Sequence, residues 1–498
     1  MKQVVGLLFV LIGLLCAGCG HEETPAVNLF FTSDIEGVFW SRPEPRYGNE
    51  VTGGLSVLKA FLDKQTLPFI LLEGGNWFSQ TPEGNLSQGG YFNTAAATLP
   101  YAGRLFTEKD LVYGWPSLSH MMKDSPAPFI LSNVQTAQGQ QPAGSRPWLL
   151  KEAGGVKVGI FGLVSTHAAH GKQRVNGLKV TDEIAAARQT VQLLRDKGAQ
   201  VVVLMSALGS PEDETALTDA GLAEEVSGMD IILSSNLGRE QAETDRVGKT
   251  LIVYPGSKLD GVGRVSLFMN KDGSLASARF EDVVLYRRDW GEDAAVAEQV
   301  AQVRRTARGQ MGRVAGKLDQ GLSGRLDAES DLGDFVADCL RKWARSDAAV
   351  VYSDSLRADL PAGNITQYDL YKLYPYADNV TYLTIKGSAL RQALEEGLSL
   401  PGNFAQISGL QVRYNPALPA GKRILSLQVN GNAFSPSATY RVAVTDHALS
   451  GGAGHDGFID SLEFKNTQVE VRTVLRLCLA GNKPVPVPQG SRWKEIKK

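Results

Sequence analysis

The chain has 498 residues, with 51 basic and 53 acidic side chains and a hydrophobic content of 43%. This length exceeds what a single hydrophobic core supports, so we expect two domains. The composition is that of a globular protein, and the near-neutral charge gives no basis for nucleic acid as a partner.

The first residues are typical of an export signal. Lys2 precedes an apolar run over residues 4–15, which is too short to span a bilayer. Ala17 and Gly18 directly before Cys19 resemble a bacterial lipobox, although Cys16 stands where that motif usually has leucine. The resemblance implies a signal peptide over residues 1–18, lipidation of Cys19 and a tether over residues 19–26. It predicts an exported protein anchored to the periplasmic or outer face of a bacterial membrane. A plain secretory signal cleaved nearby is the alternative.

Residues 27–290 alternate between strand-like and helix-like patterns. Short apolar runs predict strands, and amphipathic spacing predicts helices. The predicted strands are residues 27–33, 67–72, 129–134, 156–163, 201–205, 231–234 and 251–254, and the predicted helices are residues 55–64 and 182–196. This alternation favours an α/β domain, in which ligands bind beyond the carboxyl ends of the strands.

The pattern changes over residues 291–326, where Ala and Val are spaced along a polar segment. We predict a helix there that connects the two domains. Residues 327–498 again mix helix (332–344) and strand (348–352) and are expected to form a second α/β domain. Cys339 and Cys478 are the cysteines beyond the N-terminal segment. A disulfide bond explains them, and two separate buried thiols explain them almost as well.

Polar residues follow several of the predicted strands. They are Thr32-Ser33-Asp34-Ile35-Glu36-Gly37, Glu73-Gly74-Gly75-Asn76, Ser206-Ala207-Leu208-Gly209 and Ser234-Ser235-Asn236-Leu237-Gly238. Their order and spacing resemble the calcineurin-like metallophosphoesterase domain of the periplasmic 5'-nucleotidase and UDP-sugar hydrolase family. Gly53-Gly54-Leu55, Thr81-Pro82 and Pro255-Gly256-Ser257 support the same alignment. The resemblance implies a phosphoesterase fold whose usual site holds two metals that polarise a phosphate and generate a hydroxide nucleophile.

This sequence departs from the family at most of those metal positions, although it retains Asp34. Glu36 replaces a histidine and Asn76 replaces the bridging aspartate. Glu108 stands for a ligand asparagine, and Lys109 and Val112 replace the catalytic histidine and its acidic partner. The histidines of the later loops are replaced by Ala207, Asn236 and Gly238.

Two interpretations of this altered site remain. The oxygens of Asp34, Glu36, Asn76 and Glu108 could hold one hard cation such as Mg²⁺ or Ca²⁺, whereas a dinuclear centre is not expected. In the interpretation that we favour, Lys109 pairs with Glu36 or Glu108, and a salt bridge fills the former metal site.

The second domain resembles the family's C-terminal nucleotide-binding domain more closely. The matching motifs are residues 329–334, 356–363 and 403–409 and Ser450-Gly451-Gly452. The resemblance implies that Arg357, Phe404 and His447 occupy substrate-binding positions, and that Ala453 replaces a ligand-binding aspartate. The alternative is that Phe404 is a core residue and Arg357 forms a structural salt bridge.

These observations favour a lipid-anchored, catalytically impaired or inactive member of the 5'-nucleotidase family that acts as a binding or scaffold protein. Nucleosides and nucleotides are the candidate ligands. The alternative is an active phosphoesterase that hydrolyses nucleotides or related phosphate esters with an atypical metal site. A fold does not decide between these functions, and the sequence assigns no catalytic residue.

Overall fold

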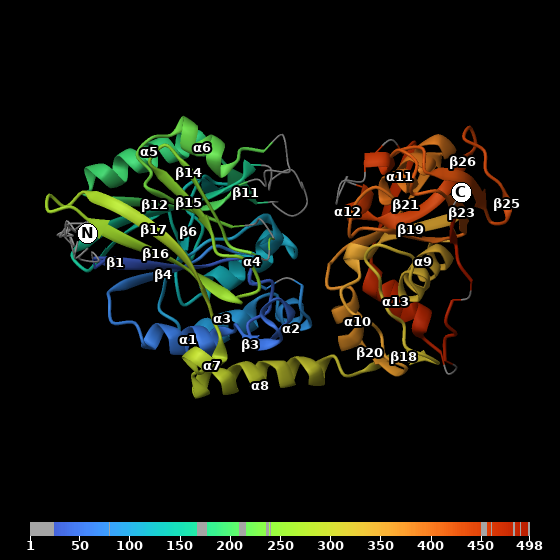
Figure 1. Cartoon of the computed structure of the whole chain (residues 1–498), viewed down its shortest axis with the longest axis horizontal. Coiled ribbons are helices and arrows are strands. Elements are labelled where there is room, and N and C mark those ends of the chain that lie inside the picture. Colours follow the sequence, from blue (N-terminus) through green and yellow to red (C-terminus); the bar gives the residue numbers. More distant parts are fainter. Residues whose placement is uncertain are drawn as a thin grey trace, which may run out of the picture.

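The computed structural model describes residues 24–78, 80–166, 177–208, 216–235, 239, 241–449, 456–459, 461–481, 484–488 and 490–496. The predicted signal peptide and Cys19, together with Asn236, Gly238 and Ala453, lie outside these residues. The prediction of two α/β domains is confirmed, and Figure 1 shows them side by side with a helix along one edge.

Two sheets form the centre of the N-terminal domain. The first has the spatial order β17 (Leu275–Val284), β16 (Gly261–Met269), β1 (Val27–Thr32), β4 (Phe69–Glu73), β5 (Tyr101–Arg104), β6 (Phe129–Ile130) and β8 (Ser145–Arg146). The second has the order β14 (Glu243–Val247), β15 (Thr250–Tyr254), β13 (Ile231–Ser234), β12 (Val201–Ala207), β10 (Val156–Val164) and β9 (Trp148–Ala153). Two small sheets pair β2 (Arg42–Glu44) with β3 (Glu50–Thr52), and β7 (Val134–Thr136) with β11 (Leu178–Val180).

Helices cover both outer faces of this pair of sheets, so the domain has four layers (Figure 1). On one side lie α1 (Leu55–Asp63), α2 (Pro82–Ser87), α3 (Gly90–Ala96), α4 (Gly114–Lys123) and α7 (Arg287–Trp290), and on the other lie α5 (Glu183–Asp196) and α6 (Asp219–Glu225). The sequence explains α5 well. Asp182 caps its first turn by accepting from the Ala185 backbone N–H at 2.7 Å, and Ala187, Val191 and Leu194 form its buried stripe.

The segment predicted as a connecting helix over residues 291–326 is helical only in part. Helix α8 spans Ala294–Gln310, and β18 (Val314–Leu318) then pairs with β20 (Gly363–Thr366). The difference arises because residues 314–318 find hydrogen-bonding partners in the second domain, which a pattern of spaced apolar residues cannot show.

The C-terminal domain is built on a five-stranded sheet in the order β22 (Ala405–Ser408), β19 (Ala348–Tyr352), β26 (Thr439–Thr445), β21 (Asn379–Lys386) and β27 (Glu463–Glu470). A four-stranded sheet has the order β25 (Asn432–Ala433), β24 (Ile424–Val429), β23 (Leu410–Tyr414) and β28 (Trp493–Glu495). The helices are α9 (Asp331–Ala344), α10 (Gln367–Leu373), α11 (Gly387–Gly397), α12 (Asp446–Leu449) and α13 (Val471–Leu479).

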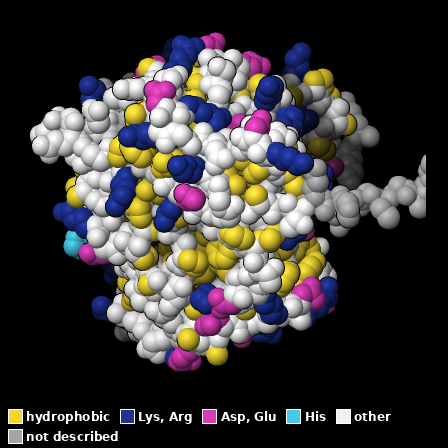
Figure 2. Space-filling model, turned by 90° about the vertical axis from the view of Figure 1, so that its left-hand side faces the viewer, with side chains coloured by type: hydrophobic (Ala, Val, Ile, Leu, Met, Phe, Trp, Pro, Cys, Tyr) yellow, Lys and Arg dark blue, Asp and Glu magenta, His cyan; other side chains and the backbone are white. Residues whose placement is uncertain are grey.

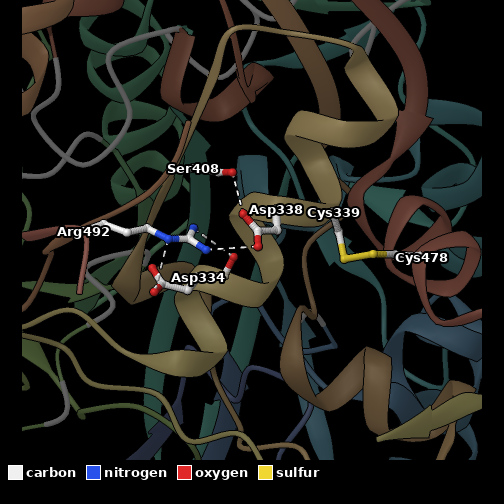
Figure 3. The surroundings of a disulfide bond; sticks show 6 residues. All are labelled: Asp334, Asp338, Cys339, Ser408, Cys478 and Arg492. Carbon is white, nitrogen blue, oxygen red and sulfur yellow. Dashed lines mark hydrogen bonds and ion pairs between the residues drawn. A yellow bond between two sulfur atoms is a disulfide. The ribbon is translucent and has the colours of Figure 1, made fainter. Parts of the chain in front are cut away.

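A disulfide bond joins α9 to α13 between Cys339 and Cys478, whose Cα atoms lie 5.6 Å apart (Figure 3). This settles the question that the sequence left open. Beside the bond, the Arg492 guanidinium pairs with Asp338 at 3.0 Å and with Asp334 at 3.4 Å, which fastens the C-terminal segment to α9. A disulfide that closes a loop of 139 residues contributes on the order of 2–5 kcal/mol to stability.

The two domains touch through α2, and Glu83 lies at the centre of this contact. Its buried carboxylate accepts from the Tyr368 hydroxyl of the C-terminal domain at 2.9 Å and lies 3.5 Å from Arg304 of α8. The Asn85 side-chain amide donates to the Pro375 carbonyl at 2.8 Å. These contacts set the C-terminal domain against the loops that follow β1 and β4. Within the described part of the chain, no helix combines the length and the apolar character that crossing a bilayer requires.

Candidate functional site

The candidate site lies beyond the carboxyl ends of the strands in the N-terminal domain, where an α/β sheet usually binds its ligand. Asp34 follows β1, Asn76 follows β4, Ala207 ends β12 and Lys258 follows β15. The structure therefore brings together residues that are more than 200 positions apart in the chain.

Asp34 is completely buried, and both of its carboxylate oxygens accept from neutral donors. The Asn76 side-chain amide donates to Oδ1 at 2.6 Å, and the Tyr254 hydroxyl donates to Oδ2 at 3.0 Å. Burial and the Asp34 carboxylate both raise the pKa of Tyr254, so the hydroxyl keeps its proton and remains a donor. Two uncharged donors thus contact the two oxygens that a metal centre would use.

Three residues of this site adopt the left-handed backbone region, namely Asp34 at φ 47°, Glu36 at φ 55° and Asn76 at φ 53°. Each such non-glycine residue costs on the order of 1 kcal/mol, Asn the least. Backbone hydrogen bonds hold the two loops in this shape, from Asp34 N–H to the Gly75 carbonyl at 3.0 Å and from Glu36 N–H to the Asn76 carbonyl at 2.8 Å. The strained loops therefore support each other.

Glu36 is buried, with 5% of its surface exposed. Burial raises the pKa of this carboxyl, the nearby Asp34 charge raises it further, and the positive charges of Lys109, Lys258 and Arg357 lower it. Among the described residues, no direct ion pair joins Lys109 to Glu36 or Glu108, so the predicted salt bridge is wrong. Lys109 lies in a short helical turn, Glu108–Leu111, and acts on Glu36 through space.

Asp110, rather than Glu108, connects this turn to the site. Its buried carboxylate accepts from the backbone N–H groups of Asn76 at 2.6 Å, Trp77 at 3.2 Å and Thr107 at 2.9 Å. Burial raises the pKa of Asp110 to about 6, while these hydrogen bonds lower it. Asp110 thereby fixes the position of Asn76 and, through it, the donor to Asp34.

The later loops contribute hydroxyls and a carboxylate instead of imidazoles. Ala207 is buried and has no donor atom. The hydroxyls of Ser206 and Ser234, at the ends of β12 and β13, both donate to the carboxylate of the half-buried Asp219, and desolvation of this carboxylate raises its pKa. These side chains satisfy one another.

The residues present do not fit a two-metal centre. In the part of the chain that the structure describes, no three His, Cys, Asp or Glu side chains are grouped so that they could hold a metal ion. Glu108 therefore does not complete a set of three carboxylates with Asp34 and Glu36. Both oxygens of Asp34 already accept hydrogen bonds, and Ala207 offers no ligand.

The C-terminal domain faces this site with Arg357. Its guanidinium donates to the Gln80 side chain of the N-terminal domain at 3.4 Å and to the Asp354 carbonyl at 3.3 Å. Burial raises the pKa of Asp354, and the positive charges of His447 and Arg357 lower it. Two of the predicted binding residues therefore act on the same carboxyl group.

Phe404 is placed differently from the prediction that it stacks on a base. Only 7% of its surface is exposed, and its ring packs edge-to-face on Trp493 at 5.1 Å between centroids. This placement agrees with the alternative that Phe404 is a core residue, because the ring packs between β22 and β28. The structure therefore leaves Arg357 and His447 as the better placed of the three residues.

Sequence reasoning missed Tyr254, Lys258 and Asp354. Tyr254 and Lys258 flank the Pro255-Gly256-Ser257 motif, and Asp354 lies three residues before Arg357. Their positions at the end of a strand or just after it were a usable signal. The residues that these three side chains contact could not be predicted from the sequence, because each of the three acts on a residue of another loop.

Comparison with known proteins agrees with this architecture. Residues 311–460 match the family described as 5'-nucleotidase, C-terminal domain. The chain is 21% identical over 559 residues to a 5'-nucleotidase of Vibrio cholerae, and the alignment covers all of both chains. It is 24% identical over 388 residues to the trifunctional nucleotide phosphoesterase protein YfkN of Bacillus subtilis, which covers 72% of this chain. The chain spans only 26% of the length of that relative.

Similarity to solved structures extends over both domains. The crystal structure of a 5'-nucleotidase precursor from Thermus thermophilus covers 95% of this chain and 99% of its own, with a TM-score of 0.73 and 20% identity. At this level of identity the similarity establishes the fold alone.

We predict that Asn76→Asp destabilises the protein in a pH-dependent way. The introduced carboxyl would replace an amide that lies 2.6 Å from Asp34, and two carboxylates so close cannot both ionise without a cation between them. In a chelating buffer we expect the free energy of unfolding to fall by about 3 kcal/mol or more at pH 8. The loss should be smaller at pH 5, because the folded state raises the pKa of the introduced carboxyl and stability then decreases as pH rises.

Chemical denaturation at both pH values measures this effect. Asn76→Ala is the matched control, since it removes the amide without adding a charge and should show a weaker pH dependence. An equal loss for Asn76→Asp at pH 5 and pH 8 would contradict the interpretation.

Proposed function

We propose that this chain, whose residues 311–460 match the 5'-nucleotidase C-terminal domain family, is a lipid-anchored, exported relative of the 5'-nucleotidases that binds an anionic ligand without hydrolysing it. The observation that carries the proposal is the state of Asp34. Its oxygens accept from Asn76 and Tyr254, and these neutral donors stand where hydrolysis by this fold needs cations.

The charges around the site support an anionic ligand. Lys109, Lys258 and Arg357 all act on Glu36, so three positive charges lie near this buried carboxyl group. Arg357 is exposed and reaches toward the N-terminal domain, where it could bind phosphate or carboxylate oxygens. A nucleotide is the ligand that the family relationship favours.

The disulfide bond supports export. Cys339 and Cys478 are paired, and such bonds persist mainly in oxidising compartments outside the cytoplasm. This agrees with the predicted signal peptide and with the lipobox-like residues before Cys19, which lie outside the described part of the chain.

We predict no phosphoesterase turnover above background. Protein supplied with excess Mn²⁺, Zn²⁺ or Mg²⁺ should leave AMP, UDP-glucose and a generic phosphodiester unchanged, because the site lacks the ligands that place two cations at a phosphate. Phosphate release and chromatography of the reaction mixture measure this directly. Metal-dependent hydrolysis that disappears in Asp34→Ala would sink the proposal and establish the active phosphoesterase instead.

A second prediction concerns the ligand. Calorimetry in a chelating buffer should detect weak, millimolar binding of AMP or a UDP-sugar, and Arg357→Gln should weaken it about tenfold or more because a charged hydrogen bond is lost. Arg413→Gln changes an exposed arginine on β23 and is the matched control. Phe404→Leu should lower stability but leave affinity unchanged, since the ring packs on Trp493. If neither nucleotide produced heat with the wild type, the binding proposal would fail.

A further inference from the structure

Seven segments at one end of the N-terminal domain lie where the described chain begins. In each of the two sheets the parallel strands start at this end, and Figure 1 shows β1 there, in the domain half that lies away from the C-terminal domain. We call this end the N-terminal pole. It comprises residues 24–26, 64–68, 153–157, 195–200, 226–230, 248–249 and 270–274.

Contacts between these turns show that they form one surface. A Cβ atom on Gly154 would lie 2.2 Å from the Ala26 carbonyl oxygen and 3.5 Å from Pro68, so the starts of β1, β4 and β10 are adjacent. The Gln200 side chain donates to the Gly273 carbonyl at 2.8 Å, which joins the start of β12 to the β16–β17 turn. Arg195 binds Asp230 at 2.7 Å and adds the start of β13.

The N-terminal pole is positively charged, although the chain as a whole is not. Its segments contain six basic residues and three acidic ones, a net charge of +3, whereas the whole chain has a net charge of −2. Arg195 pairs with Asp230, and Asp196 and Asp272 are exposed, so the excess positive charge that faces solvent comes from one exposed lysine in each of five turns. These are Lys64, Lys157, Lys197, Lys249 and Lys271.

Apolar side chains lie among these lysines. The Lys64 ammonium lies 5.7 Å from the centre of the Trp290 ring, and the Lys197 ammonium lies 5.1 Å from that of Trp148. Pro68 is exposed, and Leu67 and Phe69 beside it are half-buried. Figure 2, which views this end of the molecule, shows hydrophobic side chains in a band, with Lys and Arg side chains and several Asp and Glu side chains around it. Lysines beside amphipathic aromatic rings suit the interface between water and an anionic bilayer.

We propose that the N-terminal pole docks on an anionic phospholipid surface, with the lysines of its five turns binding lipid phosphates. The inference rests on the lipid anchor in the proposed function. If Cys19 carries the lipid, four residues lie between it and Thr24, and the five Cα–Cα steps from Cys19 to Thr24 span at most about 18 Å. The bilayer that holds the anchor is therefore the surface within reach of this pole.

Docking in this orientation has a consequence for the candidate site. Asp34, Asn76 and Tyr254 lie at the opposite ends of the strands, so the site and the C-terminal domain face away from the membrane. The ligand would then reach the protein from the aqueous side.

The test uses the full-length, lipidated protein in vesicles. Thr66→Cys places an environment-sensitive fluorophore on an exposed turn of the N-terminal pole, and Asn432→Cys places it on exposed β25 of the C-terminal domain. The native cysteines in the disulfide do not react with the label. Quenching by spin-labelled lipids is compared in vesicles of phosphatidylcholine with and without phosphatidylglycerol. We expect strong quenching at residue 66 in the anionic vesicles, reduced by high salt, and none at residue 432.

A charge-matched pair of variants completes the test. Replacing Lys157, Lys249 and Lys271 with Glu should lower the docked-to-undocked ratio by at least about tenfold, since each lysine near an anionic surface contributes severalfold. Replacing the exposed Lys386, Lys422 and Lys465 of the C-terminal domain with Glu changes the net charge equally and should leave docking intact.

Mass spectrometry of the N-terminal peptide distinguishes failure of the proposed docking surface from failure of the proposed lipid anchor. A lipidated Cys19 with no quenching at residue 66 would overturn the docking surface and leave the anchor in place. Absence of lipid on the wild-type protein would overturn the anchor and the docking surface together. Equal effects of the two triple variants would overturn the assignment of docking to this pole, because docking would then depend on net charge alone.

Discussion

The hydrogen bonds to the Asp34 carboxylate are the interaction on which the candidate site depends. A buried, ionised carboxylate is expensive unless charges or donors compensate it. Here the Asn76 amide and the Tyr254 hydroxyl provide the donors, and Asp110 holds the backbone of Asn76 in place through its N–H group. The two loops keep their left-handed residues because this network and the backbone bonds between them hold both in register.

This replacement explains how the architecture persists while the metal ligands differ. A centre built from imidazoles and carboxylates needs cations to offset its charge, whereas a network of neutral donors around one carboxylate is stable by itself. The same logic applies at the later loops, where the Ser206 and Ser234 hydroxyls satisfy Asp219. The contact of Glu83 with Tyr368 and Arg304 then positions the exposed Arg357 opposite the site.

Much of the fold could be predicted from the sequence, because hydrophobic periodicity marks buried strands such as 201–205 and capped helices such as 182–196 within a residue or two of β12 and α5. The end of the connecting helix could not, since β18 depends on a partner strand 49 residues further along the chain. The grouping of Asp34, Glu36 and Asn76 followed from strand order. Strand order did not predict the partners of Lys109 and Phe404. Which residues these side chains contact depends on the shape of the loops that carry them, and the sequence does not specify that shape. The Cys339–Cys478 pairing likewise required the three-dimensional arrangement of α9 and α13.

The central claim is that neutral donors have replaced the two-metal centre, and metal stoichiometry tests it most directly. The purified protein is equilibrated with excess Mn²⁺, freed of unbound metal by gel filtration, and analysed for metal per chain by mass spectrometry. The account predicts fewer than two bound metals, and a single oxygen-bound cation remains compatible with it. Two tightly bound metals per chain, lost together in Asp34→Ala, would contradict it.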